Sequence, residues 1–255
     1  MSASTHSPVL KHHFDNLEQQ HSAERLGMWM FLVTEVLFFG GMFCAYTAYR
    51  IWFPAEWAYA SSKLIVWIAA LNTGLLITSS LTMTLAIRSA QLGDRSGLMR
   101  YLVITFLLGA GFLGFKAFEY YTDVQEKYVP GPMFQKAYAE ANDALANGHH
   151  PEHNPASELA EHNKGLKPGD AGYISPERVQ LFLCFYYIMT GIHGVHILVG
   201  LGCIAWLMIE SKLGHIPREN YSTVEVVSLY WHLVDMIWLF LMPLLYLTGA
   251  GLGKH

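Results

Sequence analysis

The 255-residue sequence is poor in charged residues and in cysteine. Charged residues make up 14% of the chain, well below the roughly 25% of an average soluble domain. Hydrophobic residues make up 53%. The three cysteines form no CxxC motif and no regularly spaced pairs, which argues against a disulfide framework and against a thiolate metal site. This composition is typical of an integral membrane protein.

Several common functional motifs are also missing. The sequence has no glycine-rich phosphate loop, no serine nucleophile elbow and no basic aromatic patch, so it gives no sign of nucleotide hydrolysis, serine catalysis or nucleic-acid binding. Residues 1–24 contain no apolar core and no cleavage-like site. We therefore predict a polar N-terminal tail rather than a secretory signal peptide.

Five apolar stretches are long enough to cross a bilayer, which takes about 20 helical residues. They cover residues 26–50, 63–88, 99–121, 179–209 and 224–248. A backbone in lipid must satisfy its own hydrogen bonds, so each stretch is predicted to be a helix. Their hydrophobicity is continuous rather than alternating, which excludes a transmembrane β-barrel. The sequence predicts an all-α integral membrane bundle of five transmembrane helices within a membrane domain at residues 25–255.

One connection, residues 122–178, is long and contains five basic and nine acidic residues. We predict an exposed acidic loop with a short helix near residues 133–146, and both a partner-docking surface and a tolerated insertion remain open. Basic residues favour the cytoplasmic side of short loops. The link 88–100 holds three arginines, and the link 211–222 holds Lys212 and Arg218. The N-terminus is then cytoplasmic and the acidic loop lies outside.

Five ionisable side chains fall near the middle of predicted spans: Glu35, His193, His196, His232 and Asp235. Such groups are costly in lipid, usually face protein or water, and are functional candidates. The three-residue spacing places His193 with His196, and His232 with Asp235, on one helix face. A metal site is one interpretation, although HxxH is a weak signal for it. Packed neutral histidines are another, and a proton-handling role is the third, since a desolvated carboxyl group can hold a proton near neutral pH.

The third span carries a lysine and a glutamate three residues apart, Lys116 and Glu119, near its outer end. We predict a structural ion pair there, with the lysine reaching toward water. Small residues let membrane helices approach closely. The glycines predicted at such contacts are Gly109, Gly111, Gly114, Gly191 and Gly194.

Four segments in order, LGMWMFLVTEVLFFGGMF, FLGFKAFEYY, TGIHGVHILVG and VEVVSLYWHLVDMIWLFLMPLLY, closely resemble subunit III of the haem–copper terminal oxidases, in particular that of cytochrome c oxidase. The likeness spans all five predicted helices and omits the long loop. It implies a subunit that is not an enzyme by itself and holds no haem or copper, with those cofactors in partner subunits of the respiratory chain. It also implies packing on subunit I, phospholipid binding, support of proton uptake and translocation, and protection from turnover-linked inactivation. Glu35 falls on the family's buried, carbodiimide-reactive glutamate.

The resemblance implies oxidase subunits I and II, membrane phospholipids, and cytochrome c as electron donor to the complex, and it leaves a larger respiratory supercomplex open. Many family members have seven helices, so the first two are either supplied by subunit I or absent. The five-helix form favours a bacterial plasma (inner) membrane. Alternatives are a subunit III-like component of a quinol oxidase or nitric oxide reductase, and, in another class, a free-standing proton channel or transporter. We further hypothesise that His193 or His196 forms a hydrogen bond with Glu35.

Overall fold

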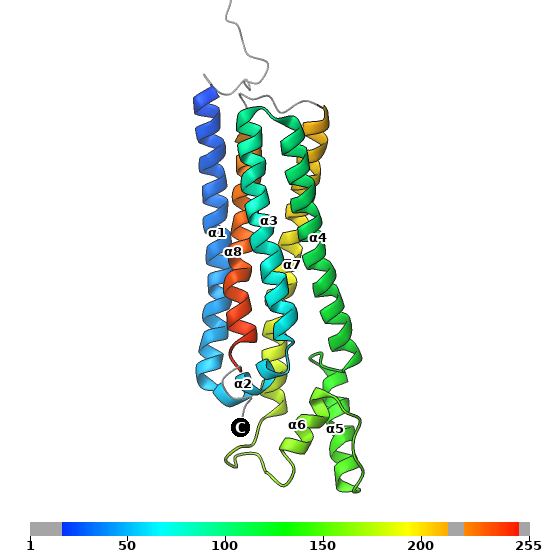
Figure 1. The fold of residues 1–255 in the computed structure, drawn as a ribbon. Coiled ribbons are helices and arrows are strands. Elements are labelled where there is room, and N and C mark those ends of the chain that lie inside the picture. The colour runs from blue at the N-terminus through cyan, green and yellow to red at the C-terminus, as the bar shows by residue number, and fades with distance from the viewer. Residues whose placement is uncertain (1–16, 214–221, 250–255) are drawn as a thin grey trace, which may run out of the picture. The chain divides into compact units, whose positions relative to one another are not determined.

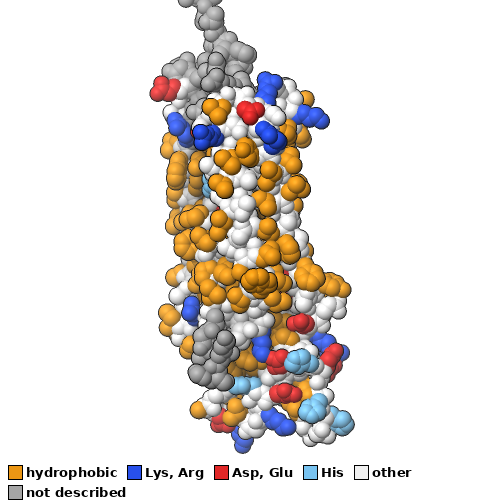
Figure 2. Space-filling model, viewed as in Figure 1, with side chains coloured by type: hydrophobic (Ala, Val, Ile, Leu, Met, Phe, Trp, Pro, Cys, Tyr) orange, Lys and Arg blue, Asp and Glu red, His pale blue; other side chains and the backbone are white. Residues whose placement is uncertain are grey.

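The computed structural model describes residues 17–213 and 222–249, and in these ranges the chain is helical with no strand (Figure 1). The helices are α1 Leu17–Trp52, α2 Pro54–Ser62, α3 Val66–Leu92, α4 Arg95–Gln125, α5 Pro132–Ala146, α6 Pro155–His162, α7 Pro176–Leu213 and α8 Ser222–Tyr246. Five of them, α1, α3, α4, α7 and α8, have the length and apolar composition to cross a membrane. Figure 2 shows hydrophobic side chains over the long helices and charged side chains gathered toward the helix ends. The predicted all-α membrane bundle is confirmed.

The long helices extend beyond the predicted spans. α1 begins at Leu17 rather than at residue 26, because the stretch before the apolar run contains good helix formers and no proline or glycine. α7 begins at Pro176, and proline is favoured at a first helical position. Most of the predicted N-terminal tail, residues 1–16, and the part of the link containing Arg218 lie outside the described residues.

The predicted loop at residues 122–178 is a folded helical hairpin. α5 lies where a short helix was predicted, and α6 adds a second one that packs against it (Figure 1). Asn154 caps α6: its side chain accepts from the Ser157 backbone N–H at 2.9 Å, and the Ser157 hydroxyl accepts from the Asn154 N–H at 3.0 Å. This reciprocal capping box satisfies two donors at the helix start. The buried side chains that α5 and α6 contribute include Phe134, Ala137, Ala141, Ala156, Leu159 and Ala160.

The chain divides into two compact units. Unit 1 holds the described residues up to Gly40 together with Leu75–Ala110 and Val195–Ile237. Unit 2 holds Gly41–Gly74, Gly111–Gly194 and the described residues from Trp238 onward. Each of the five long helices therefore contributes one part of its length to each unit.

The core of unit 1 centres on Trp231 of α8, which is fully buried. Its indole Nε1 donates a hydrogen bond to Ser79 Oγ of α3 at 3.1 Å. Its ring also lies against two glycines. A Cβ on Gly109 of α4 would stand 2.6 Å from the ring, and a Cβ on Gly200 of α7 would stand 2.8 Å from it. One tryptophan thus joins α8 to three other helices, and the two glycines make room for it.

In unit 2, hydroxyl groups from earlier helices anchor the C-terminal end of α8. The last carbonyl groups of a helix have no partner within it. Tyr46 of α1 donates to Leu244 O at 2.7 Å, and Ser61 of α2 donates to Leu245 O at 2.7 Å. The backbone N–H of Gly249 donates to Ser61 Oγ at 3.1 Å. α8 therefore ends where α1 and α2 hold it.

Candidate functional site

Glu35 of α1 and His196 of α7 form a hydrogen-bonded pair within unit 1. His196 Nε2 lies 2.9 Å from Glu35 Oε2, and each side chain is 18% exposed. Phe39 lies edge-on to the imidazole at 5.2 Å, and Tyr230 donates its hydroxyl to His196 O at 3.0 Å. The hydrogen bond that the sequence predicted between Glu35 and one of the two histidines is present, and it is made by His196.

This pair can hold one proton in two ways. If the imidazole ring carries this proton, the protonated ring donates from Nε2 to the carboxylate, and the bond is charge-assisted and stronger. If the carboxyl group carries the proton instead, it donates to the neutral ring. Both side chains keep some exposure.

His193 lies among aromatic rings. It lies in unit 2, fully buried, with its ring 5.6 Å from Phe112 and 5.2 Å from Trp238. The two histidines therefore have different immediate neighbours. Residues three apart on a helix differ by about 60° in direction and about 4.5 Å in height, which is enough for one ring to meet a carboxylate and the other to meet aromatic rings.

His232 and Asp235 lie near Ser80, a serine that was not predicted to belong to a polar site. His232 Nδ1 is 2.7 Å from Ser80 Oγ of α3. Asp235, three residues further along α8, is buried and has its carboxyl group near the same serine. A single serine in an apolar helix gives no sequence signal that distinguishes it from the other hydroxyl residues of that helix.

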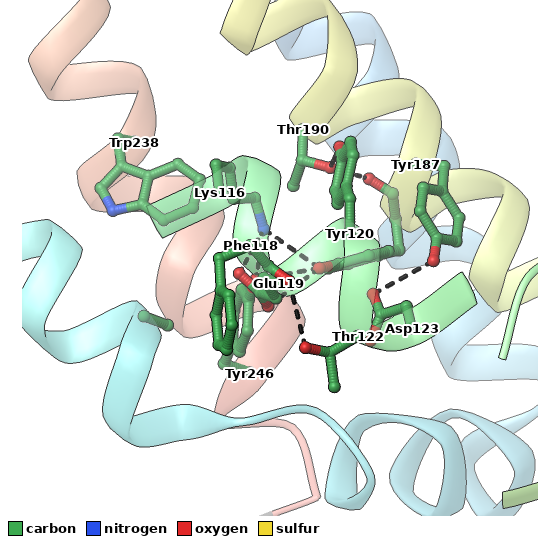
Figure 3. A network of polar contacts seen from close by, with 12 residues as sticks. Lys116, Phe118, Glu119, Tyr120, Thr122, Asp123, Tyr187, Thr190, Trp238 and Tyr246 are labelled. Atoms are coloured by element: carbon green, nitrogen blue, oxygen red, sulfur yellow. Dashed lines mark hydrogen bonds and ion pairs between the residues drawn. The ribbon is translucent and has the colours of Figure 1, made fainter. Parts of the chain in front are cut away.

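Unit 2 contains a second polar site, which we call the Lys116 cluster: Lys116, Glu119, Tyr186 and Tyr246. Figure 3 shows three of its members, Lys116, Glu119 and Tyr246, meeting from α4 and α8. Lys116 Nζ lies 2.9 Å from Glu119 Oε2, 3.0 Å from Tyr186 OH and 2.6 Å from Tyr246 OH. Glu119 Oε1 accepts from Tyr186 at 2.9 Å and from Tyr246 at 2.6 Å.

The predicted ion pair is confirmed, but the lysine does not reach water. Lys116 is 5% exposed and Glu119 is 1% exposed. Four aromatic rings surround the ammonium group at 4.8–5.4 Å from their centroids, and such rings attract a cation. With every polar atom engaged, the pair can remain buried. The tyrosines were missed because nothing in their local sequence shows that they meet a lysine of α4.

The glycines predicted at helix contacts differ from one another. Gly109 packs against Trp231, as predicted. A Cβ would meet no described atom within 4 Å at three others, namely Gly114, Gly191 and Gly194, so helix packing at these three positions stays a prediction. A small residue produces close packing only where another helix crosses it, and within this chain the crossing on α7 falls at Gly200 instead. Gly111 stays a prediction.

No group of three or more His, Cys, Asp or Glu side chains is placed to hold a metal ion within residues 17–213 and 222–249. The histidines of α7 and α8 have separate neighbours: Glu35 for His196, aromatic rings for His193, and Ser80 for His232. These side chains do not fit a haem or copper site, which needs several ligands directed at one point.

The family model described as cytochrome c oxidase subunit III matches residues 9–126 and 178–250. The match includes all five long helices and leaves out residues 127–177, which we call the insertion. The chain is 27% identical over 234 residues to a probable cytochrome c oxidase subunit 3 from Nocardia farcinica, covering 90% of this chain and 92% of that protein. It is 26% identical to cytochrome c oxidase subunit 3 from Thermostichus vulcanus, covering 91% of each chain.

A third relative, cytochrome c oxidase subunit 3 of Loxodonta africana, is 26% identical over 89% of this chain but only 70% of its own length. The shared part therefore omits almost a third of that longer protein. Most of this chain, including every long helix, is matched by the family model, and the chain belongs to the cytochrome c oxidase subunit III family.

Proposed function

We propose that this chain, as subunit III of a cytochrome c oxidase, is a non-catalytic subunit that packs on subunit I and binds phospholipid. In this role it supports proton uptake and the stability of the complex. In this proposal the haem and copper centres belong to the partner subunits, where they carry out electron transfer to oxygen. The residues of this chain contribute protonatable groups and an apolar surface.

The observation that carries the proposal is the hydrogen bond between Glu35 and His196 at 2.9 Å. A carboxyl group and an imidazole in an apolar bundle cost free energy, so such groups are kept where they serve a function. The pair is 18% exposed on each side, which suits exchange of a proton with a neighbouring subunit or a bound water. His193, His232 and Asp235 are the further members of the proposed midplane polar network, although each has its own surroundings.

Support for the packing and lipid roles comes from α1. Many of its large apolar side chains are exposed, among them Trp29 at 57%, Met30 at 66% and Leu37 at 70%. Side chains of this size are stable in contact with lipid tails or with another membrane helix. We assign this surface to phospholipid and to subunit I.

We further propose the orientation and the surroundings of the subunit. Arg88, Arg95 and Arg100 flank the connection between α3 and α4, which favours a cytoplasmic location for it. The N-terminus is then cytoplasmic and the insertion lies outside a bacterial plasma membrane. Subunit II, cytochrome c as donor, and a respiratory supercomplex are the partners to be sought.

The test begins with purification of the chain from its native membrane in a mild detergent. Co-purifying haem, copper and cyanide-sensitive oxygen uptake support the proposal. A colourless, solitary protein that moves protons by itself contradicts it and favours the channel or transporter. Oxygen uptake driven by quinol but not by reduced cytochrome c assigns the chain to a quinol oxidase instead.

Replacement of Glu35 then tests the role of the pair. We expect Glu35→Gln to leave assembly intact, to shorten the active lifetime, and to slow proton uptake by less than about tenfold, or about 1.4 kcal/mol in the barrier. Glu18→Gln, at an exposed position of the same helix, is the matched control and should change neither quantity. Complete loss of oxygen reduction in a normally assembled complex would show that the role assigned to Glu35 is wrong.

A further inference from the structure

The insertion is fastened to α2, a short helix inside the family-matched part of the chain. Lys63, at the C-cap of α2, forms an ion pair with Glu158 of α6. Tyr128 donates its hydroxyl to the Ala60 carbonyl at 2.9 Å, and both groups are buried. Tyr59 lies with its ring 6.0 Å from that of His162. The hairpin is thus attached through α2 by charge, hydrogen bonding and ring contact.

The same short helix holds the end of α8. Ser61 donates to Leu245 O at 2.7 Å and accepts from the Gly249 N–H at 3.1 Å. The backbone at Gly249 lies so close to Ala58 O and Ser62 that no side chain would fit there. Contacts to the hairpin and to α8 therefore occupy neighbouring residues of α2, Ala60 and Ser61.

The held end of α8 places a member of the Lys116 cluster. Tyr246 directly follows Leu245, whose carbonyl accepts from Ser61. The Tyr246 hydroxyl lies 2.6 Å from Lys116 Nζ and 2.6 Å from Glu119 Oε1. All of these residues belong to unit 2, so an unbroken series of contacts runs from the insertion to a buried ion pair.

We propose that the insertion acts through α2 as a clamp on the end of α8, so that the seating of the hairpin sets the hydrogen bonding of the Lys116 cluster. Hydrogen bonds weaken steeply as distance and angle depart from their optimum, so a displacement of Tyr246 by about 1 Å disturbs both of its contacts. Pro243 lies inside α8, three residues before Tyr246, and it removes one backbone hydrogen bond from the last turns. The bonds from Ser61 of α2, together with the bond from Tyr46 of α1 to Leu244 O, therefore fix this end of the helix. The clamp requires no role for Glu35 in proton uptake, so it can fail or hold independently of that role.

The experiment uses the assembled complex in lipid nanodiscs, with fluorotyrosine placed at position 246 alone. Fluorine NMR reports the surroundings of that ring, and amide hydrogen exchange reports the Gly249 N–H. Glu158→Gln loosens the hairpin from Lys63, and Ser61→Ala breaks the contact between α2 and α8. Glu140→Gln is the matched control, because it removes a pair with Lys136 that is exposed and lies on the same hairpin.

The clamp predicts a shifted fluorine signal and several-fold faster exchange at Gly249 in both Glu158→Gln and Ser61→Ala, with neither change in Glu140→Gln. A shift in Ser61→Ala alone would overturn the proposal, because the insertion would then have no influence on α8. Equal shifts in Glu158→Gln and Glu140→Gln would also overturn it, since the effect would not pass through the Lys63 contact. If Glu158→Gln does not assemble, Tyr128→Phe tests the second attachment by the same two measurements.

Discussion

Adding one methyl group at Gly109 should disrupt the core of unit 1. A Cβ at this position would stand 2.6 Å from Cη2 of Trp231 and 3.0 Å from Cδ2 of Leu201, whereas carbon atoms in good contact lie about 3.5–4.0 Å apart. The indole ring would have to move by about 1 Å. Gly200 also lies against this ring, where an added Cβ would stand 2.8 Å from it, so a second helix packs closely on the same side chain.

The expected loss follows from three terms. Overpacking a well-filled core costs about 1–3 kcal/mol, and displacement of Trp231 weakens its hydrogen bond to Ser79, worth about 0.5–1.5 kcal/mol. Alanine is favoured over glycine inside a helix by about 1 kcal/mol, which offsets part of the loss. We expect Gly109→Ala to lower the free energy of unfolding by about 1–3 kcal/mol. Gly200→Ala should behave in the same way, since its Cβ would stand 2.8 Å from the same ring.

Two glycines of the same helices provide matched controls. Gly114 of α4 and Gly202 of α7 have no described atom within 4 Å of an added Cβ, so alanine there should be neutral or slightly stabilising. Reversible unfolding by SDS in mixed micelles measures all four variants. Trp231→Phe, which removes the outer ring carbons, should cost less in the Gly109→Ala background than in the parent protein. If Gly109→Ala proves as stable as Gly114→Ala, the packing argument is wrong.

Two further predictions concern unit 2. Lys116→Met leaves Glu119 buried without its cation and should cost about 3–5 kcal/mol. Combined with Glu119→Leu it should cost less than the sum of the single changes, and additive losses in SDS unfolding would contradict the buried pair. Burial raises the pKa of Tyr128 well above its ordinary value, so its contribution is present below about pH 10 and is lost as pH rises through the higher folded-state pKa. The stability advantage of the parent over Tyr128→Phe should stay constant to about pH 10 and then shrink, and a loss beginning near pH 8 would refute this.

The sequence was sufficient to predict the long helices and one polar contact. Continuous apolar length determines a membrane helix whatever its neighbours are, so all five long helices follow from the sequence alone. Glu35 was recognisable because a carboxyl group is rare in such a helix. With histidines on another helix, few partners were available to it, and His196 is the one it meets.

Most of the other polar contacts, and the hairpin, could not be predicted, because they depend on packing between segments that are far apart in the sequence. Tyr186 and Tyr246 lie 67 and 127 residues from the glutamate they contact, and their local sequence resembles that of any aromatic residue in an apolar helix. The helix α6 is only eight residues long, and its capping residues could equally begin a turn. The sequence could predict that some glycines lie where two helices pack closely. Which glycine a neighbouring helix crosses depends on the rotation of both helices about their axes, which the sequence does not show.

The two hydroxyl groups that hold the end of α8 have a consequence for biosynthesis. Tyr46 and Leu244 are separated by 198 residues, and Ser61 and Leu245 by 184. α1 and α2 are synthesised well before α8, so the hydroxyl groups of Tyr46 and Ser61 can bond to these carbonyl groups only after α8 has been inserted. The C-terminal end of α8 therefore reaches its final position only when helices made early and helices made late in synthesis have met.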